Sequence, residues 1–275
     1  MQLNFFLQQA FAQHALIAAT LIAIACGLIG SFVITRGLAF AVHGTSELAF
    51  TGAAAGLLVA NNPLAGALIG AVLVAIVIGV LGVKERERDA TIGVILAFGL
   101  GMGVLLLSLY HGFATQATSI LFGNIFGVST TQLAILVVLS LVVSVTMLVL
   151  YRPLLFASID PEAAAARGVP VWGLGIIFLI ILALTVTSAA QVVGTILVLS
   201  LAITPAASAL QLAANPRTVS VLSVLFALIA ADGGVVASLA SGTVKVSVFV
   251  AAISFIIYVL ARSGRVLFAP VRKQS

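Results

Sequence analysis

The sequence predicts an all-α protein that crosses a membrane eight or nine times and forms one transmembrane domain over residues 1–275. Apolar residues make up 63% of the chain and charged residues only 7%, far below the roughly 25% charged residues of a soluble domain. The second observation is that nearly all lysines and arginines fall in alternate gaps between long apolar runs. By the positive-inside rule those gaps face the cytoplasm. They hold Arg36, Lys84, Arg86, Arg88, Arg152, Arg167, Arg217, Arg262, Arg265, Arg272 and Lys273, and only Lys245 lies elsewhere.

Eight apolar runs approach the roughly 20 residues that a transmembrane helix needs. A ninth segment, residues 47–61, is shorter and rich in glycine and alanine, so we expect a half-helix or a tilted span packed among neighbours. Since Arg36 and Lys84 are both placed inside, the chain must leave and return between them, which makes nine crossings with the N-terminus outside and the C-terminus inside. The eight runs are 15–35, 64–83, 90–110, 131–151, 171–187, 192–213, 218–237 and 243–261.

The chain start and the single cysteine exclude several other classes. Residues 1–13 contain no lysine or arginine, so the positive region of a cleaved signal peptide is missing and the first run is expected to stay in the mature chain. Cys26 is the one cysteine, which excludes an intrachain disulfide and a cysteine metal cluster. The net charge of +5 is scattered over the gaps without interleaved aromatic residues, which argues against a nucleic-acid partner.

The cytoplasmic connection after the fifth span predicts a short helix over residues 160–168. Asp160 is a natural N-cap, Pro161 suits the first helical position, and Glu162 favours the positive end of the helix dipole. Gly168 closes the helix, with Arg167 beside it. The sequence therefore predicts a surface helix that is either a capped loop without a partner or a coupling helix that docks on a cytoplasmic motor protein through its small, apolar face.

In their order and spacing, several motifs resemble the membrane permease subunits of zinc- and manganese-uptake ABC transporters. The resemblance covers most of the chain, although each motif alone is weak. The motifs are Gly30 to Arg36 before a short polar helix, Asp89-Ala-Thr-Ile-Gly93, Leu121-Phe-Gly-Asn124, Asp160-Pro-Glu-x5-Gly168, and the stretch from Val193 to Pro205-Ala-Ala.

The resemblance implies a homodimeric type II (metal-chelate-type) ABC importer permease in a bacterial inner membrane. Its implied partners are two cytoplasmic ATPase subunits and an extracytoplasmic metal-binding protein. The chain contains no GxxxxGK[ST] phosphate loop, so it is expected not to hydrolyse ATP itself. No permanent cofactor is expected. The implied substrate is a divalent transition metal ion, with zinc placed first and manganese or iron as alternatives.

His43 and Glu47 are the predicted metal ligands. Residues four apart share one face of a helix, and an imidazole with a carboxylate suits Zn(II), Mn(II) or Fe(II). In the family this place carries Gly-Asp-Ala-Leu-Ser-His, so the present chain keeps one imidazole and one carboxylate in exchanged order. Two ligands per subunit, doubled by a twofold axis, would give a brief four-ligand station. The alternative is a purely structural pair at a helix start.

Other polar residues are weaker candidates. Ser46 and Thr51 flank the pair and are predicted to line the path, while Thr204 and Pro205 interrupt the seventh span and are predicted to form a gate, a hinge or a dimer seam. His111, Asp232 and Lys245 are expected in outer loops, where they are solvated or meet the binding protein.

Three rival functions remain open at this point. A permease for a chelated metal would need a wide cavity without ligands and usually a longer chain. A self-contained secondary carrier would use His43 and Glu47 for titration and need no ATPase. An intramembrane enzyme has no supporting motif, because neither a nucleophile with its base nor HExxH occurs.

Overall fold

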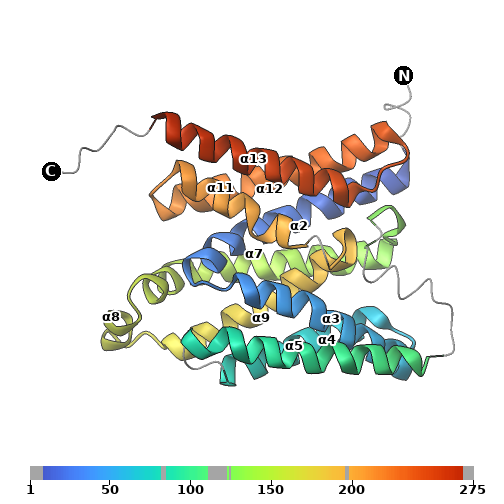
Figure 1. The fold of residues 1–275 in the computed structure, drawn as a ribbon, viewed down its shortest axis with the longest axis horizontal. Helices are drawn as coiled ribbons and strands as arrows, with labels where there is room; N and C mark the ends of the chain where they lie inside the picture. The colour runs from blue at the N-terminus through green and yellow to red at the C-terminus, as the bar shows by residue number, and fades with distance from the viewer. Residues whose placement is uncertain (1–8, 82–84, 111–122, 124, 196–197, 269–275) are drawn as a thin grey trace.

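The computed structural model is all-helical, and it describes residues 9–81, 85–110, 123, 125–195 and 198–268. Its long helices run side by side between two ends of the bundle, and the short helix α8 (Pro161–Ala166) lies at one of them (Figure 1). We call these the α8 end and the opposite end. The long helices are α2 (Ala10–Thr35), α3 (Ala39–Ala60), α4 (Pro63–Leu81), α5 (Glu85–Ser108), α7 (Thr130–Ile159), α9 (Val171–Val193), α12 (Pro216–Ser241) and α13 (Val246–Phe268).

Within the described residues, seven helices are long and apolar enough to cross a membrane. Two further candidates are α3 and the broken pair of α10 (Val198–Ala202) and α11 (Thr204–Leu212), and a bundle of about seven to nine spans agrees with the predicted eight or nine. The predicted all-α transmembrane bundle is confirmed. Of the two alternatives for residues 47–61, the structure has the full span and not the half-helix, although it begins earlier than predicted: α3 begins at Ala39 and its 22 residues extend over about 33 Å, enough to span the hydrocarbon core.

Helix α2 is the centre of the bundle. It packs against α12, α7, α9 and α11, and about half of its residues are buried, most of them small. Gly27 and Gly30 allow this closeness, because a Cβ on either residue would meet the backbone of α12 or of α10 within 2.6 Å. Small residues let membrane helices approach until their backbones touch, so α2 can be surrounded on several sides at once.

Helix α3 is joined to α4 by a seam of four glycines. Gly52 and Gly56 of α3 face Gly66 and Gly70 of α4, and a Cβ on Gly70 would lie 2.7 Å from the Cα of Gly52. The turn between the two helices is closed by Asn61, which adopts a left-handed conformation with φ of 52°. The seam therefore holds α3 by backbone contact, and the polar side chains of α3 are not needed for it.

Three predicted boundaries are corrected by the structure. Helix α7 does not end near residue 151 but continues through Pro153 to Ile159, because Leu154 and Ala157 pack into the core and compensate the lost backbone hydrogen bond. Helix α12 continues past residue 237 to Ser241. The run 192–213 starts too early, since α9 extends to Val193, and the predicted interruption is a break at Ile203, two residues before Pro205, between α10 and α11.

Candidate functional site

His43 and Glu47 form a pair on one face of α3, near the α8 end. The Nε2 atom of His43 lies 3.2 Å from Oε1 of Glu47, and the two side chains are 38% and 28% exposed. Their neighbours in sequence, from Ala41 to Phe50, are otherwise buried. The imidazole and the carboxylate are therefore the partly exposed polar groups on a face of α3 that the rest of this chain does not cover.

The two nitrogens of His43 are in different surroundings. Nε2 faces Glu47, while Nδ1 is buried and has no hydrogen-bond partner among the described residues. A neutral imidazole has one nitrogen that accepts and one that donates. The pair thus presents one nitrogen and up to two carboxylate oxygens to a cation, a donor set that suits Zn(II) and Mn(II).

Ser46 and Thr51, the predicted path residues, both donate hydrogen bonds to helix backbone. Ser46 is completely buried and donates to the carbonyl oxygen of His43 at 2.8 Å. Thr51 donates to the carbonyl oxygen of Gly99 on α5 at 2.7 Å, and Leu48 packs where a Cβ of Gly99 would stand. In this conformation both hydroxyls are engaged with backbone, and the bond from Thr51 links α3 to α5.

The ligand set in one copy of the chain is small. Among the described residues, no group of three or more histidine, cysteine, aspartate or glutamate side chains is close enough to hold a metal ion. One copy therefore offers two ligating groups at the pair. A full tetrahedral shell needs four, so a cation at His43 and Glu47 would take its remaining ligands from water or from a second protein surface.

Thr204 and Pro205 lie at the break between α10 and α11. Pro205 is buried in the first turn of α11, and Ser208 donates to the carbonyl oxygen of Thr204 at 2.8 Å. The lost N–H of a proline is harmless in a first turn, where it would have no partner in the helix. The proline thus starts a new helix here, and the gate or hinge role of the break remains a prediction.

The predicted surface helix is present as α8. The carboxylate of Asp160 accepts from the backbone N–H of Ala163 at 2.9 Å, Pro161 occupies the first turn, and Glu162 is exposed beside it. Gly168 takes a φ of +81° and ends the helix. Ala164 of α8 is fully buried, so the exposed apolar face of this helix is narrower than its run of four alanines indicated.

Arg167 is exposed at the end of α8. Its guanidinium carbon lies 5.6 Å from the ring centre of Phe156 on α7, a distance at which a cation is attracted to the ring face. The contact ties the end of α8 back to α7.

Asp232 does not lie in an outer turn, and that prediction is wrong. It stands inside α12, about 2.5 turns before the helix ends at Ser241, and Thr20 of α2 donates to its Oδ1 at 3.0 Å. The sequence Asp-Gly-Gly resembles a turn, but Gly234 packs against Val250 of α13 and keeps the helix continuous. Lys245 is exposed between α12 and α13, as expected, and His111 lies outside the described residues.

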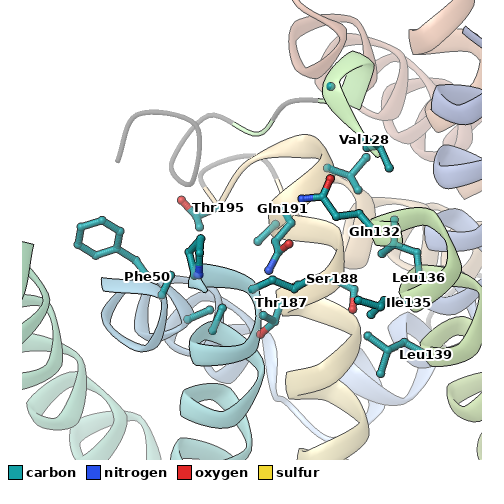
Figure 2. Close-up of a pocket in the computed structure, with 18 residues that line it drawn as sticks. Phe50, Val128, Gln132, Ile135, Leu136, Leu139, Thr187, Ser188, Gln191 and Thr195 are labelled. Carbon is teal, nitrogen blue, oxygen red and sulfur yellow. The ribbon is translucent and has the colours of Figure 1, made fainter. Parts of the chain in front are cut away.

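A cavity of about 190 Å³ lies among α3, α4, α7 and α9, and none of the predicted site residues lines it. Figure 2 shows Gln132, Thr187, Ser188, Gln191 and Thr195 around it, so its polar lining carries no charge. The hydroxyl of Thr187 is fully buried without a hydrogen-bond partner among the described residues. No sequence motif announced this cavity, because its polar residues are isolated in apolar runs.

Comparison with known proteins places the chain in a family. The model of the ABC 3 transport family matches residues 8–263. The manganese transport system membrane protein MntC of Halalkalibacterium halodurans is 33% identical over 85% of this chain and 82% of its own length. MntC of Listeria monocytogenes is 31% identical over 97% and 96%. The high-affinity zinc uptake system membrane protein ZnuB of Haemophilus influenzae is 25% identical over 82% and 86%.

The fold matches a solved structure equally well. PsaBC from Streptococcus pneumoniae, solved in complex with a Fab, aligns with a TM-score of 0.83 and 27% identity over 94% of this chain and 93% of its own. The helix order described above is thus that of a type II ABC importer permease, as the sequence predicted. The chain belongs to the ABC 3 transport family and is a membrane-embedded permease subunit of an ABC transporter, without catalytic activity of its own.

Proposed function

We propose that this permease imports a divalent transition metal ion, Mn(II) or Zn(II), along the face of α3 that carries His43 and Glu47. The observation that carries the proposal is the partly exposed pair of His43 and Glu47, whose Nε2 and Oε1 atoms lie 3.2 Å apart. Ionisable side chains inside membrane helices are costly and usually face a partner or a water-filled path. An imidazole and a carboxylate are also the ligands that these two ions accept.

Manganese is now the better supported cargo. The two MntC relatives at 31% and 33% identity are named for manganese, whereas the relative named for zinc is 25% identical. The sequence alone had favoured zinc. A carboxylate paired with one imidazole is less selective for zinc than a site with thiolates or several imidazoles, which agrees with the weight of the relatives.

The orientation follows from the charges at the α8 end. Arg36, Arg152, Arg167 and Arg217 all stand at this end of their helices, and the positive-inside rule places it in the cytoplasm. The C-terminus is then cytoplasmic and the N-terminus external. An ATPase subunit would dock at α8, and an extracytoplasmic metal-binding protein would deliver the ion at the opposite end.

Two ligands per chain suit a transient station. A second copy of the chain, related by a twofold axis, would bring a second His43 and Glu47 to the same passage and briefly complete four ligands. An ion that is bound too tightly does not leave on the timescale of transport. ATP binding and hydrolysis in the partner subunits would shift the dimer between outward and inward forms, because nucleotide binds the two arrangements with different affinity.

The proposal is tested by metal uptake into vesicles that contain this permease with the ATPase and the binding protein encoded beside it. Radioactive Mn(II) and Zn(II) are offered separately and in competition. We expect ATP-dependent uptake of at least one ion, and a loss of at least roughly 10-fold in His43→Ala and Glu47→Ala, the lower end of what loss of an outer ligand partner costs at a metal site. Thermal unfolding of each variant checks that the bundle is intact.

The same vesicles separate the rival functions. Uptake of a metal chelate in preference to the free ion would indicate a chelate permease. Uptake that persists with an ATPase-inactive partner but follows a proton or sodium gradient would indicate a secondary carrier. If both alanine variants take up every ion at the wild-type rate, the assignment of the site is wrong.

A further inference from the structure

Arg36 connects three helices at the α8 end. It is the C-cap residue of α2, and its Nε–H donates to the hydroxyl of Ser158 on α7 at 2.7 Å. The Ser158 hydroxyl in turn donates to the carbonyl oxygen of Leu154, so it donates and accepts at once. The guanidinium carbon of Arg36 also lies 5.3 Å from the ring centre of Phe178 on α9.

The ring below Arg36 is rigidly held. Phe178 is fully buried and packs against Phe32 of α2 with ring centres 6.1 Å apart, while Phe32 meets Tyr151 of α7 edge to face at 5.5 Å. One ring from each of the three helices thus forms a floor for the guanidinium. A cation over an aromatic face is attracted by the negative face of the ring, and more strongly where water is excluded.

The contacts of Arg36 lie between α8 and α3, the two helices for which roles are proposed above. Ser158 precedes Asp160, the N-cap of α8, by two residues. On the other side, Arg36 and Gly37 lead directly into α3, since the backbone N–H of Leu38 bonds to the carbonyl of Val33 and α3 begins at Ala39. His43 follows after about one helical turn. A displacement of the corner between α7 and α8 therefore reaches the base of α3 through one hydrogen bond.

We propose that Arg36 is a positioning residue that transmits movement of α8 to α3, and so links the ATPase subunit to the His43–Glu47 pair. The proposal rests on the coupling role of α8 in the function proposed above. The guanidinium suits this task, because its planar, fixed donors hold a defined direction and its face stacks on an aromatic ring at the same time. A lysine would keep the charge but lose the Nε–H geometry and the stacking.

Two readouts in the assembled complex test the proposal. The first is hydrogen exchange of residues 39–47 with and without trapped nucleotide, which depends on no transported cargo. The second is the number of metal ions taken up per ATP hydrolysed. In Arg36→Gln we expect the nucleotide-dependent change in exchange to disappear. We also expect ions per ATP to fall by about fivefold while hydrolysis continues, within the range found for residues along coupled networks.

Ser158→Ala should reduce both readouts in the same direction but less, because the ring contact of Arg36 remains. The double variant Arg36→Gln, Ser158→Ala should be no worse than Arg36→Gln, since residues that act through one contact are not additive. Arg36→Lys should fall between Arg36→Gln and wild type. The matched control is Arg152→Gln, which removes an exposed arginine from the same end of α7 and should leave both readouts unchanged.

A merely structural role would lower the yield of complex but leave ions per ATP and the exchange response of the surviving complex at wild-type values. That result in Arg36→Gln, or in Ser158→Ala if Arg36→Gln does not fold, would overturn the proposal. If wild type moved no metal at all, the proposed cargo would be wrong. The exchange readout would still decide whether Arg36 transmits the nucleotide signal.

Discussion

Two carboxylates lie within the long helices well away from their ends, and they are held in opposite ways. Glu47 is paired with His43 on its own helix, on a face that the rest of the chain leaves open. Asp232 is bound across a helix interface, where it accepts from Thr20 of α2 at 3.0 Å. The comparison teaches that a polar side chain at membrane depth is not by itself a transport site. Its partner decides whether its oxygens remain available to a passing ion.

The helices that carry the two carboxylates are also seated differently. Helix α3 rests on α4 through glycines, at backbone distance, and on α5 through side chains that pack against Gly99 and Gly103. Helix α12 packs on α2 through Gly27 but adds the hydrogen bond between Thr20 and Asp232. We therefore expect the fold around Glu47 to be independent of its charge, and the fold around Asp232 to gain a little from its hydrogen bond.

The largest effect is expected where the glycine seam is broken. In Gly66→Leu the new Cβ would stand 2.5 Å from the Cα of Gly56, and neither backbone can yield. Overpacking costs about 1–3 kcal/mol where side chains can adjust, so we expect more than 3 kcal/mol here and little folded permease. Thermal unfolding and yield measure this. The control is Gly175→Leu on α9, where nothing lies within 4 Å of the new Cβ; equal loss in both variants would refute the seam.

Neutralising Glu47 should abolish transport and spare the fold. Glu47→Gln keeps the size of the side chain but removes the charge that binds a cation, and we expect metal uptake to fall by roughly 10- to 100-fold. The unfolding temperature should stay near wild type, because α3 is held by Gly52 and Gly56. A glutamine variant that transports normally would show that Glu47 is a structural residue.

Exchanging the two ligands should cost much less than losing one. The double variant His43→Glu, Glu47→His presents the same two groups four residues apart, on the same helix face. We expect its uptake to lie well above that of Glu47→Gln, which titration of uptake against metal concentration measures. If the exchanged variant lost as much uptake as Glu47→Gln, the order of the two ligands along α3, and thus the direction from which the ion approaches, would be essential.

The smallest effect is expected at Asp232. Hydrogen bonds between membrane helices contribute about 0.6 kcal/mol on average, so Thr20→Val should lower the free energy of unfolding by about that amount. Asp232→Asn keeps an acceptor oxygen for Thr20 and should change less. Metal uptake should stay at the wild-type rate in both. A loss of uptake in Asp232→Asn with unchanged stability would place Asp232 in the transport path and erase the distinction from Glu47.

Much of the fold was predictable because apolar length and positive charge follow directly from the membrane. The N-cap of α8 was predictable because Asp160 and Pro161 act on the turn of helix that directly follows them in the sequence. The length of α3 was not, because its first turns contain His43, Thr45, Ser46 and Glu47, which interrupt the apolar run. The hydroxyls of Thr45 and Ser46 bond to carbonyl oxygens of their own helix. The glycine seam with α4, a tertiary contact, holds the helix in place.

The position of Asp232 was missed for a related reason. Aspartate followed by two glycines predicts a turn in water, but in a bundle glycines are also where helices touch. Only the packing of Gly234 on α13 distinguishes the two cases. The contact between Arg36 and Ser158 was equally out of reach, because the two residues are far apart in the chain and Ser158 belongs to no motif.

The sparse ligand set has a consequence for the cell. Proteins with a complete structural metal site fold only when the metal is supplied. Here no cluster of three or more ligating side chains occurs in the described part of the chain, and the bundle is assembled from glycine contacts and apolar packing. For the importer proposed above, this means that the permease can fold before any cargo ion reaches it, in a cell that is starved of the metal.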